Sequence, residues 1–270
     1  MQNIKHIICV ASGKGGVGKS TTAVNLALAL QSQDCRVGLL DADIYGPSLP
    51  LMMGVKPGTT PEIREQKFMC PIKAHGIECN SIGFLVDQRT AVVWRAPMMI
   101  SAFNQILGDT TWSNLDYLVV DMPPGTGDIQ LSLAQSVKIS GSVIVTTPQD
   151  VALLDARKGI EMFKKVDVPL LGIVENMSIH VCSNCGYEES IFGSGGGDSL
   201  SLDYGTEVIG RLPLDLTIRE QTDAGYPVVA SNPDHPAARA YVLLADKVAR
   251  RVEEVSTAAS ASPKITISND

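Results

Sequence analysis

A glycine-rich segment near the start of the chain constrains the fold more than any other part of the sequence. It follows the pattern G-x-x-x-x-G-K-[ST] and consists of Gly13, Lys14, Gly15, Gly16, Val17, Gly18, Lys19 and Ser20. An apolar run precedes it at residues 4–11, and a stretch with helical periodicity follows at residues 20–31. Glycines let the backbone curl so that successive N–H groups point at phosphate oxygens, and the helix start adds partial positive charge. The segment therefore predicts a phosphate-binding loop between a strand and a helix.

Two side chains of this loop have predicted roles toward a nucleotide. Lys19 is expected to reach the β- and γ-phosphates, and the Ser20 hydroxyl is expected to ligate Mg²⁺. The chain contains no Asn-Lys-x-Asp sequence, the motif that recognises guanine, and this favours ATP over GTP. A second lysine, Lys14, directly follows the first glycine. A bare phosphate loop does not need it, so on this pattern alone it is an ordinary solvated lysine.

Apolar β-branched runs alternate with helical stretches along the chain, which is typical of a parallel α/β sheet. Further strands are predicted at residues 36–41, 115–121, 142–147 and 170–175, and helices at 151–166 and 237–255. Several prolines in residues 44–95 predict a loop with short strands and an antiparallel edge. We therefore predict a single doubly wound α/β domain over residues 1–255, with a mostly parallel sheet and helices on both faces. Residues 256–270, rich in Ser, Ala and Thr, are predicted to form a disordered tail.

Three carboxylates lie at the ends of predicted strands. Asp41 and Asp43 close one strand, and Asp121 closes another in the apolar-strand-then-Asp arrangement of a Walker B motif. Because the carboxyl ends of parallel strands face the ligand crevice, we expect Asp121 to hold Mg²⁺ through water and Asp41 to support the Mg²⁺ shell. Gly125 and Gly127 give the loop after Asp121 freedom to move when the γ-phosphate leaves.

Cys182 and Cys185 form a C-x-x-C motif, followed by Gly186. Two thiolates supply half of the four ligands that a closed zinc site or a 4Fe–4S cluster needs. A complete site must therefore borrow ligands from His180, from isolated cysteines or from the same pair in a second chain. A redox pair and two incidental cysteines are the alternatives. Asn184 and Gly186 favour a turn or knuckle over the helix start that a redox pair uses.

Charge and hydropathy argue against several other classes of protein. The chain has 22 Lys and Arg and 29 Asp and Glu residues, a net charge of −7, which argues against a broad nucleic-acid-binding surface. It has no run of 18 apolar residues, and the first ten residues lead into the phosphate loop without a cleavage site. We therefore expect no membrane span, no signal peptide and a cytoplasmic location. The six cysteines are then expected to be reduced thiols or metal ligands.

Residues 14–21, which end at Thr21, resemble the deviant Walker A motif of the dimeric ATPases that include MinD, ParA and the nitrogenase iron protein. Further motifs resemble the Mrp/ApbC branch of that superfamily. They lie at residues 41–48, 121–128, 176–178, 182–186, 191–193 and 218–229, and the match runs from about residue 5 to residue 250. Members of this branch are ATP-binding carriers or scaffolds of iron–sulfur clusters.

The resemblance implies roles for individual residues. Lys14 would reach across a dimer interface to the partner's nucleotide and couple dimerisation to hydrolysis, much as an arginine finger does. Asp43 would orient the attacking water, and the whole of residues 13–21 would bind the nucleotide. Adenine contacts would come from Asn176 and from the loop at residues 211–215, which contains Pro213 and Asp215.

The resemblance also implies a slow, dimer-dependent ATP hydrolase. In this homodimer, Cys182 and Cys185 of both subunits would bridge one labile 4Fe–4S cluster and pass it to apoproteins, with no nucleic acid or membrane as partner. Two alternatives stay open: a spatial organiser like MinD or ParA, and an ATPase whose dimer is bridged by a structural zinc. The net charge and the C-x-x-C disfavour the organiser, whereas thiolates suit both metals.

Overall fold

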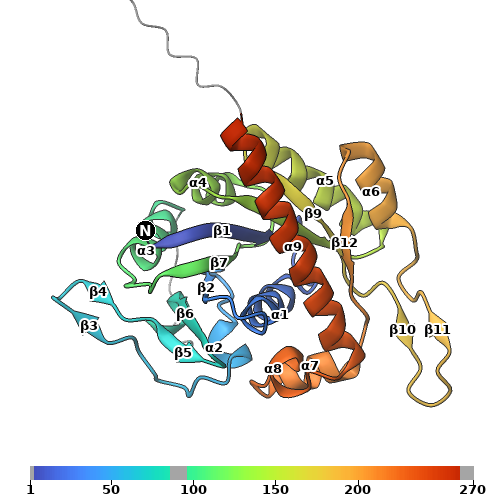
Figure 1. The fold of residues 1–270 in the computed structure, drawn as a ribbon, viewed down its shortest axis with the longest axis horizontal. Coiled ribbons are helices and arrows are strands. Elements are labelled where there is room, and N and C mark those ends of the chain that lie inside the picture. Colours follow the sequence, from blue (N-terminus) through green and yellow to red (C-terminus); the bar gives the residue numbers. More distant parts are fainter. Residues whose placement is uncertain (1–2, 86–95, 262–270) are drawn as a thin grey trace, which may run out of the picture.

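The computed structural model describes residues 3–85 and 96–261, and its centre is an eight-stranded sheet (Figure 1). The strand order is β12-β9-β8-β1-β7-β2-β6-β5. These strands are β1 (Ile4–Ala11), β2 (Val37–Asp41), β5 (Ile72–Ala74), β6 (Ile77–Ser81), β7 (Leu115–Asp121), β8 (Gly141–Thr146), β9 (Leu170–Glu175) and β12 (Val208–Arg211). All neighbours pair in parallel except β5 and β6, which form an antiparallel edge. The predicted α/β class and mostly parallel sheet are confirmed.

Helices cover both faces of the sheet. One face carries α1 (Lys19–Gln31), α2 (Leu49–Met52), α7 (Leu216–Asp223), α8 (Val228–Ser231) and α9 (Pro236–Ala261), of which α1 and α9 lie in front of the sheet in Figure 1. The other face carries α3 (Ala96–Gly108), α4 (Asp128–Ser136), α5 (Asp150–Lys165) and α6 (Gly196–Tyr204). Within the two described ranges, no helix combines the length and the apolar character that crossing a bilayer requires.

Two hydrophobic cores lie on the two sides of the sheet, because successive side chains of a strand point to opposite faces. Along β1, Ile8 and Val10 join the core beneath α1 and α9, whereas Ile7, Cys9 and Ala11 join the core beneath α3 and α5. Strands buried on both faces are continuously apolar in sequence. This is why β1, β7 and β9 have the bounds that the sequence predicts.

Two small antiparallel hairpins lie outside the main sheet. The first, β3 (Ile63–Arg64) with β4 (Phe68–Met69), belongs to the proline-rich region where short strands are predicted. The second, β10 (His180–Val181) with β11 (Glu188–Glu189), follows β9 and projects from the body of the molecule in Figure 1. Its turn contains the C-x-x-C.

The last helix is longer than predicted. Residues 256–261, expected to begin a disordered tail, are the final part of α9. The Ser256 hydroxyl donates to the Val252 carbonyl at 2.8 Å, so a side chain that often favours turns bonds within the helix instead. Residues 262–270 of the predicted tail lie outside the described residues.

We predict that a side chain at Gly225 disrupts the packing between α2 and α7. A Cβ there would lie 2.4 Å from the Gly54 Cα, and Gly225 has a φ of +81°. Gly225→Ala should lower the free energy of unfolding by about 2–4 kcal/mol, from left-handed strain together with overpacking. Gly205→Ala is the control, because Gly205 has a φ of +61° with open space around it and should lose only about 1–2 kcal/mol. Equal losses in urea denaturation would contradict the close contact.

Candidate nucleotide and metal sites

The phosphate loop lies between β1 and α1 in a form that only glycine can take. Gly16 and Gly18 have φ values of +80° and +79°, in the left-handed region. A Cβ on Gly13 would lie 2.1 Å from the backbone of Asp155, and one on Gly18 would lie 2.2 Å from the Asn176 Nδ2. The loop therefore fits the backbone cradle that phosphate binding needs.

The Lys19 ammonium lies among carboxylates at the carboxyl ends of β2 and β7. Its Nζ is 2.6 Å from the Asp121 Oδ1 and 3.7 Å from the Asp43 Oδ2. It also donates a hydrogen bond to the Ser20 Oγ at 3.2 Å. The parallel register sets Asp41 directly beside Asp121. The structure thus brings together Lys19, Ser20, Asp41 and Asp121, the side chains predicted to contact the phosphates and Mg²⁺, with Asp43, which the resemblance assigns to the attacking water.

Asp41 is the most enclosed of these carboxylates. Its Oδ1 accepts the Asp43 N–H at 3.0 Å, and its Oδ2 accepts the Ser81 hydroxyl at 3.0 Å and the Leu49 N–H at 3.3 Å. Complete burial and the neighbouring Asp121 raise the pKa of Asp41 to about 7. Burial also raises the pKa of Asp43. Asp41 therefore fixes the loop between β2 and α2, and its support of the Mg²⁺ shell stays a prediction.

Lys14 has no carboxylate partner among the salt bridges found within residues 3–85 and 96–261. Its side chain is half-buried, and its carbonyl accepts the Ser12 hydroxyl at 2.8 Å. Thr21 lies in the first turn of α1, where its carbonyl accepts the Asn25 Nδ2 at 2.9 Å. The charge of Lys14 is thus uncommitted within the described part of the chain.

The two predicted adenine segments lie side by side. The Asn176 Nδ2 donates to the Val17 carbonyl of the phosphate loop at 2.8 Å. The Leu212 N–H donates to the Glu175 carbonyl at 3.0 Å, and the Leu212 carbonyl accepts the Ser178 N–H at 3.0 Å. The segment around Asn176 therefore contacts the phosphate loop on one side and the loop after β12 on the other.

Asp215 has a structural role that the sequence reasoning missed. Its Oδ1 accepts the Thr217 N–H at 2.7 Å, which caps the N-terminus of α7. An Asp before a helical stretch is the signal that could have revealed this role. Pro213 is half-buried two residues earlier. The adenine contacts assigned to Asn176, Pro213 and Asp215 stay predictions.

The C-x-x-C forms the turn between β10 and β11. The Cys182 N–H donates to the Tyr187 carbonyl, and the Gly186 N–H donates to the Cys182 carbonyl, both at 2.9 Å. Cys185 is exposed and Cys182 partly so. The N–H groups of Cys185 and Asn184 hold the pKa of the Cys182 thiol below its ordinary value. This favours the thiolate, which is the form that binds metals.

No third ligand accompanies this pair in the described part of the chain. No three His, Cys, Asp or Glu side chains within it are placed to hold a metal ion. The His180 Nδ1 is hydrogen-bonded to the Leu214 carbonyl at 3.0 Å. Cys9 and Cys79 are buried in the two cores, where burial raises the pKa of both thiols. Within the described residues, Cys182 and Cys185 are therefore two potential thiolate ligands without a third beside them.

A buried carboxylate that the sequence reasoning passed over fixes the far end of the hairpin segment. The Glu175 Oε2 accepts the Gly197 N–H at 2.6 Å, in the first turn of α6. The Arg211 Nε lies 3.7 Å from the Glu175 Oε1. The glycine run before α6 is the available signal, since a Cβ on Gly197 would lie 2.9 Å from this carboxylate. Both ends of the hairpin segment are therefore attached near the end of β9.

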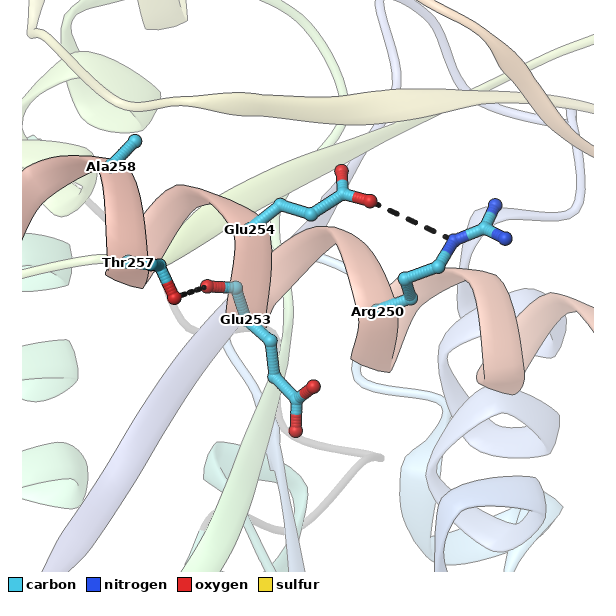
Figure 2. A pocket seen from close by; sticks show the side chains of 5 residues that line it. All are labelled: Arg250, Glu253, Glu254, Thr257 and Ala258. Carbon is cyan, nitrogen blue, oxygen red and sulfur yellow. Dashed lines mark hydrogen bonds and ion pairs between the residues drawn. The ribbon is translucent and has the colours of Figure 1, made fainter.

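A shallow pocket on α9 is separate from these groups (Figure 2). Its lining residues are Arg250, Glu253, Glu254, Thr257 and Ala258. Arg250 pairs with Glu254, with the two atoms 3.9 Å apart, and the Thr257 hydroxyl donates to the Glu253 carbonyl at 2.9 Å. All five residues belong to one helix, and none of the predicted site residues lines the pocket.

Comparison with known proteins gives the family. A family model described as NUBPL iron-transfer P-loop NTPase, in the ParA group, matches residues 3–249. The chain belongs to this family. An iron–sulfur cluster carrier protein of Pseudomonas fragi is 60% identical over 245 residues, which cover 91% of this chain and 85% of that protein. The iron–sulfur cluster transfer protein NUBPL of Mus musculus is 52% identical over 255 residues, covering 94% and 79%.

Solved structures share the fold of this chain. A nucleotide-binding protein of Archaeoglobus fulgidus, in complex with ADP, superposes with a TM-score of 0.75 at 35% identity, covering 88% of this chain and 92% of that one. The cell-division ATPase MinD of Pyrococcus furiosus superposes with a TM-score of 0.69 at 24% identity, covering 91% and 99%, and so shares the fold. The predicted resemblance to the Mrp/ApbC branch and to the MinD/ParA fold is confirmed.

We predict that Asp41 makes the nucleotide-free protein less stable as the pH rises from about 4 to about 7. The pKa of Asp41 is raised from 3.8 to about 7, so the folded state binds more protons than the unfolded state across this window. The free energy of unfolding then falls with rising pH. Asp41→Asn should flatten this slope, measured by urea denaturation at several pH values. The exposed Asp34→Asn is the matched control and should not flatten it. If the two substitutions changed the pH dependence of the free energy of unfolding equally, a group other than Asp41 would bind the extra proton of the folded state.

Proposed function

We propose that this chain is an ATP-binding and ATP-hydrolysing carrier of iron–sulfur clusters. The observation that supports it most is a thiol pair, the partly exposed Cys182 and the exposed Cys185, on a hairpin that follows Asn176, whose side chain is hydrogen-bonded to the phosphate loop. A carrier must bind its cluster firmly and also release it, so ligands at the tip of a projecting hairpin suit delivery. Relatives named as cluster carrier and cluster transfer proteins support the same activity.

In this proposal the phosphate loop holds the phosphates of ATP, and ATP with Mg²⁺ supplies the γ-phosphoryl group whose transfer to water releases free energy. Lys19 turns from Asp121 and Asp43 to the β- and γ-phosphates, because anionic oxygens compete for the same ammonium. Asp121 and Ser20 then hold Mg²⁺, with Asp41 behind them, and Asp43 orients the attacking water. The sequence resemblance is the support for these separate roles.

The proposed active form is a homodimer in the cytoplasm. Each chain contributes two thiolates, so two chains complete the four-thiolate set of one labile 4Fe–4S cluster. Lys14, which lacks a carboxylate partner in the described ranges, acts on the nucleotide of the partner subunit. Apo iron–sulfur proteins are the recipients, and neither nucleic acid nor membrane is a partner. The net charge of −7 supports this last point.

Lys14→Ala should separate nucleotide binding from turnover. The variant should bind ATP with affinity close to that of the parent, because Lys19 and the loop backbone remain. It should lose most of its hydrolysis, and its residual rate per chain should no longer rise with protein concentration. Calorimetry measures the binding, and phosphate release at several protein concentrations measures the turnover. A variant with normal turnover and normal concentration dependence would reduce Lys14 to a surface charge.

Cys182→Ser should abolish cluster binding without affecting ATP. We expect iron and sulfide in the anaerobically loaded protein to fall at least tenfold, because the two remaining thiolates of the homodimer, one from each Cys185, cannot hold the cluster. ATP affinity should stay within about twofold of the parent, since the phosphate loop is intact. Cys35→Ser, on the loop before β2, is the matched control and should keep its iron. A colourless parent protein that binds only zinc would replace the carrier by an ATPase with a structural metal.

A further inference from the structure

The base of the C-x-x-C hairpin is held by a short ladder of hydrogen bonds to the loop after β12. The Ser178 N–H and hydroxyl both donate to the Leu212 carbonyl, at 3.0 and 3.1 Å. The Leu214 N–H donates to the Ile179 carbonyl at 2.8 Å. The last rung is a side chain, because the His180 Nδ1 lies 3.0 Å from the Leu214 carbonyl oxygen. A carbonyl only accepts, so this Nδ1 carries a proton and donates it.

Beyond His180 the hairpin has only its own hydrogen bonds. The Cys182 N–H bonds to Tyr187, and the Gly186 N–H bonds to Cys182. Among the described residues, the hydrogen bonds found for residues 181–189 stay within the hairpin, and the next residue, Ser190, accepts the Gly193 N–H through its carbonyl at 3.0 Å. A two-stranded hairpin alone is marginally stable in water. The position of the thiols therefore depends on how its base is attached.

The attachment point is itself well fixed. Leu214 immediately precedes Asp215, whose carboxylate caps α7 through the Thr217 N–H at 2.7 Å. The His235 Nε2 lies 4.0 Å from the other carboxylate oxygen of Asp215. The Leu214 carbonyl, which accepts the His180 hydrogen bond, thus belongs to a segment that is fixed to α7. Through this hydrogen bond His180 attaches β10 to the same segment.

We propose, on the basis of the proposed cluster-carrier function, that His180 is a positioning residue for the C-x-x-C and not its third ligand. Its Nδ1 is engaged by Leu214, so only the Nε2 could reach a metal. In the described part of the chain His180 does not belong to any group of three potential metal ligands. Its function is to hold β10 in place so that Cys182, two residues later, meets the partner's thiols in a fixed orientation. Groups that orient metal ligands in this way tune metal affinity.

Two amide variants separate positioning from ligation. The Nδ2 of asparagine is bonded to Cγ, as the Nδ1 of histidine is, so His180→Asn keeps a donor for Leu214. The Nε2 of glutamine is two bonds from Cγ, as the Nε2 of histidine is. His180→Gln therefore keeps a nitrogen at the position from which His180 could ligate a metal, and loses the donor to Leu214. His180→Ala removes both. His75→Ala is the matched control, because it deletes a histidine hydrogen bond of 2.9 Å to the Gly225 carbonyl, on another loop.

Amide hydrogen exchange of residues 181–189 in the metal-free full-length protein tests the anchor directly. Exchange should be about five- to tenfold faster in His180→Ala and His180→Gln, and within about twofold of the parent in His180→Asn and His75→Ala. Equal exchange rates in all four variants would overturn the proposal.

Release of iron to a chelator from the anaerobically loaded protein should also be faster in His180→Ala and His180→Gln than in the parent. In His180→Asn and His75→Ala it should stay close to the parent rate. Retention by His180→Gln together with loss by His180→Asn would make His180 a ligand and overturn the proposal. A parent protein that takes up no iron or sulfide refutes the carrier function instead, and the exchange data then decide the anchor separately.

Discussion

The hydrogen bond from the Asn176 side chain to the Val17 carbonyl joins the two loops on which both sites depend. The Asn176 amide occupies the space where a Cβ of residue 18 would lie, so the phosphate loop needs Gly18 as much for this contact as for its left-handed backbone. Asn176 also begins the segment that leads to the cysteines. One buried hydrogen bond therefore connects the phosphate loop to the segment that leads to the C-x-x-C hairpin.

The charges at the ends of β2 and β7 are balanced only in part. Lys19 is the one ammonium found among Asp41, Asp43 and Asp121 in the described structure, so the cluster carries an excess of negative charge. Burying such groups costs stability, and raising the pKa of Asp41 relieves some of the cost. A divalent cation would neutralise the same excess. The arrangement therefore suits binding of Mg²⁺ together with an anion that draws Lys19 away.

Sequence patterns predicted those strands whose apolar composition follows directly from their burial in the folded structure. β1, β7 and β9 are apolar over most of their length because most of their residues are buried between the two helix layers, and their bounds match the prediction. The region of residues 44–95 is predicted only coarsely, because the short strands in its described part, residues 44–85, depend on distant partners. The Met69 N–H, for example, donates to the carbonyl of Asp109, forty residues later.

The candidate site also contains some features that follow from sequence motifs and others that depend on contacts between distant segments. The phosphate loop and the carboxylates at strand ends follow from motif and topology, so the sequence placed Lys19, Asp43 and Asp121 together. The family resemblance implies an adenine contact at Asp215, and the sequence left His180 as one possible source of a further ligand; both stay predictions. The structure adds a hydrogen bond for each residue, which the sequence did not predict: Asp215 caps α7, and His180 contacts the loop after β12. Such bonds depend on register between distant segments, which periodicity does not reveal.

In the proposed homodimer, each chain supplies half of one cluster site. Native mass spectrometry of the anaerobically loaded full-length protein tests it most directly, because it counts chains, iron and sulfide in one particle. We expect a species of two chains with about four iron and four sulfide, together with monomers that carry no cluster. A single chain that carries a complete cluster would contradict it.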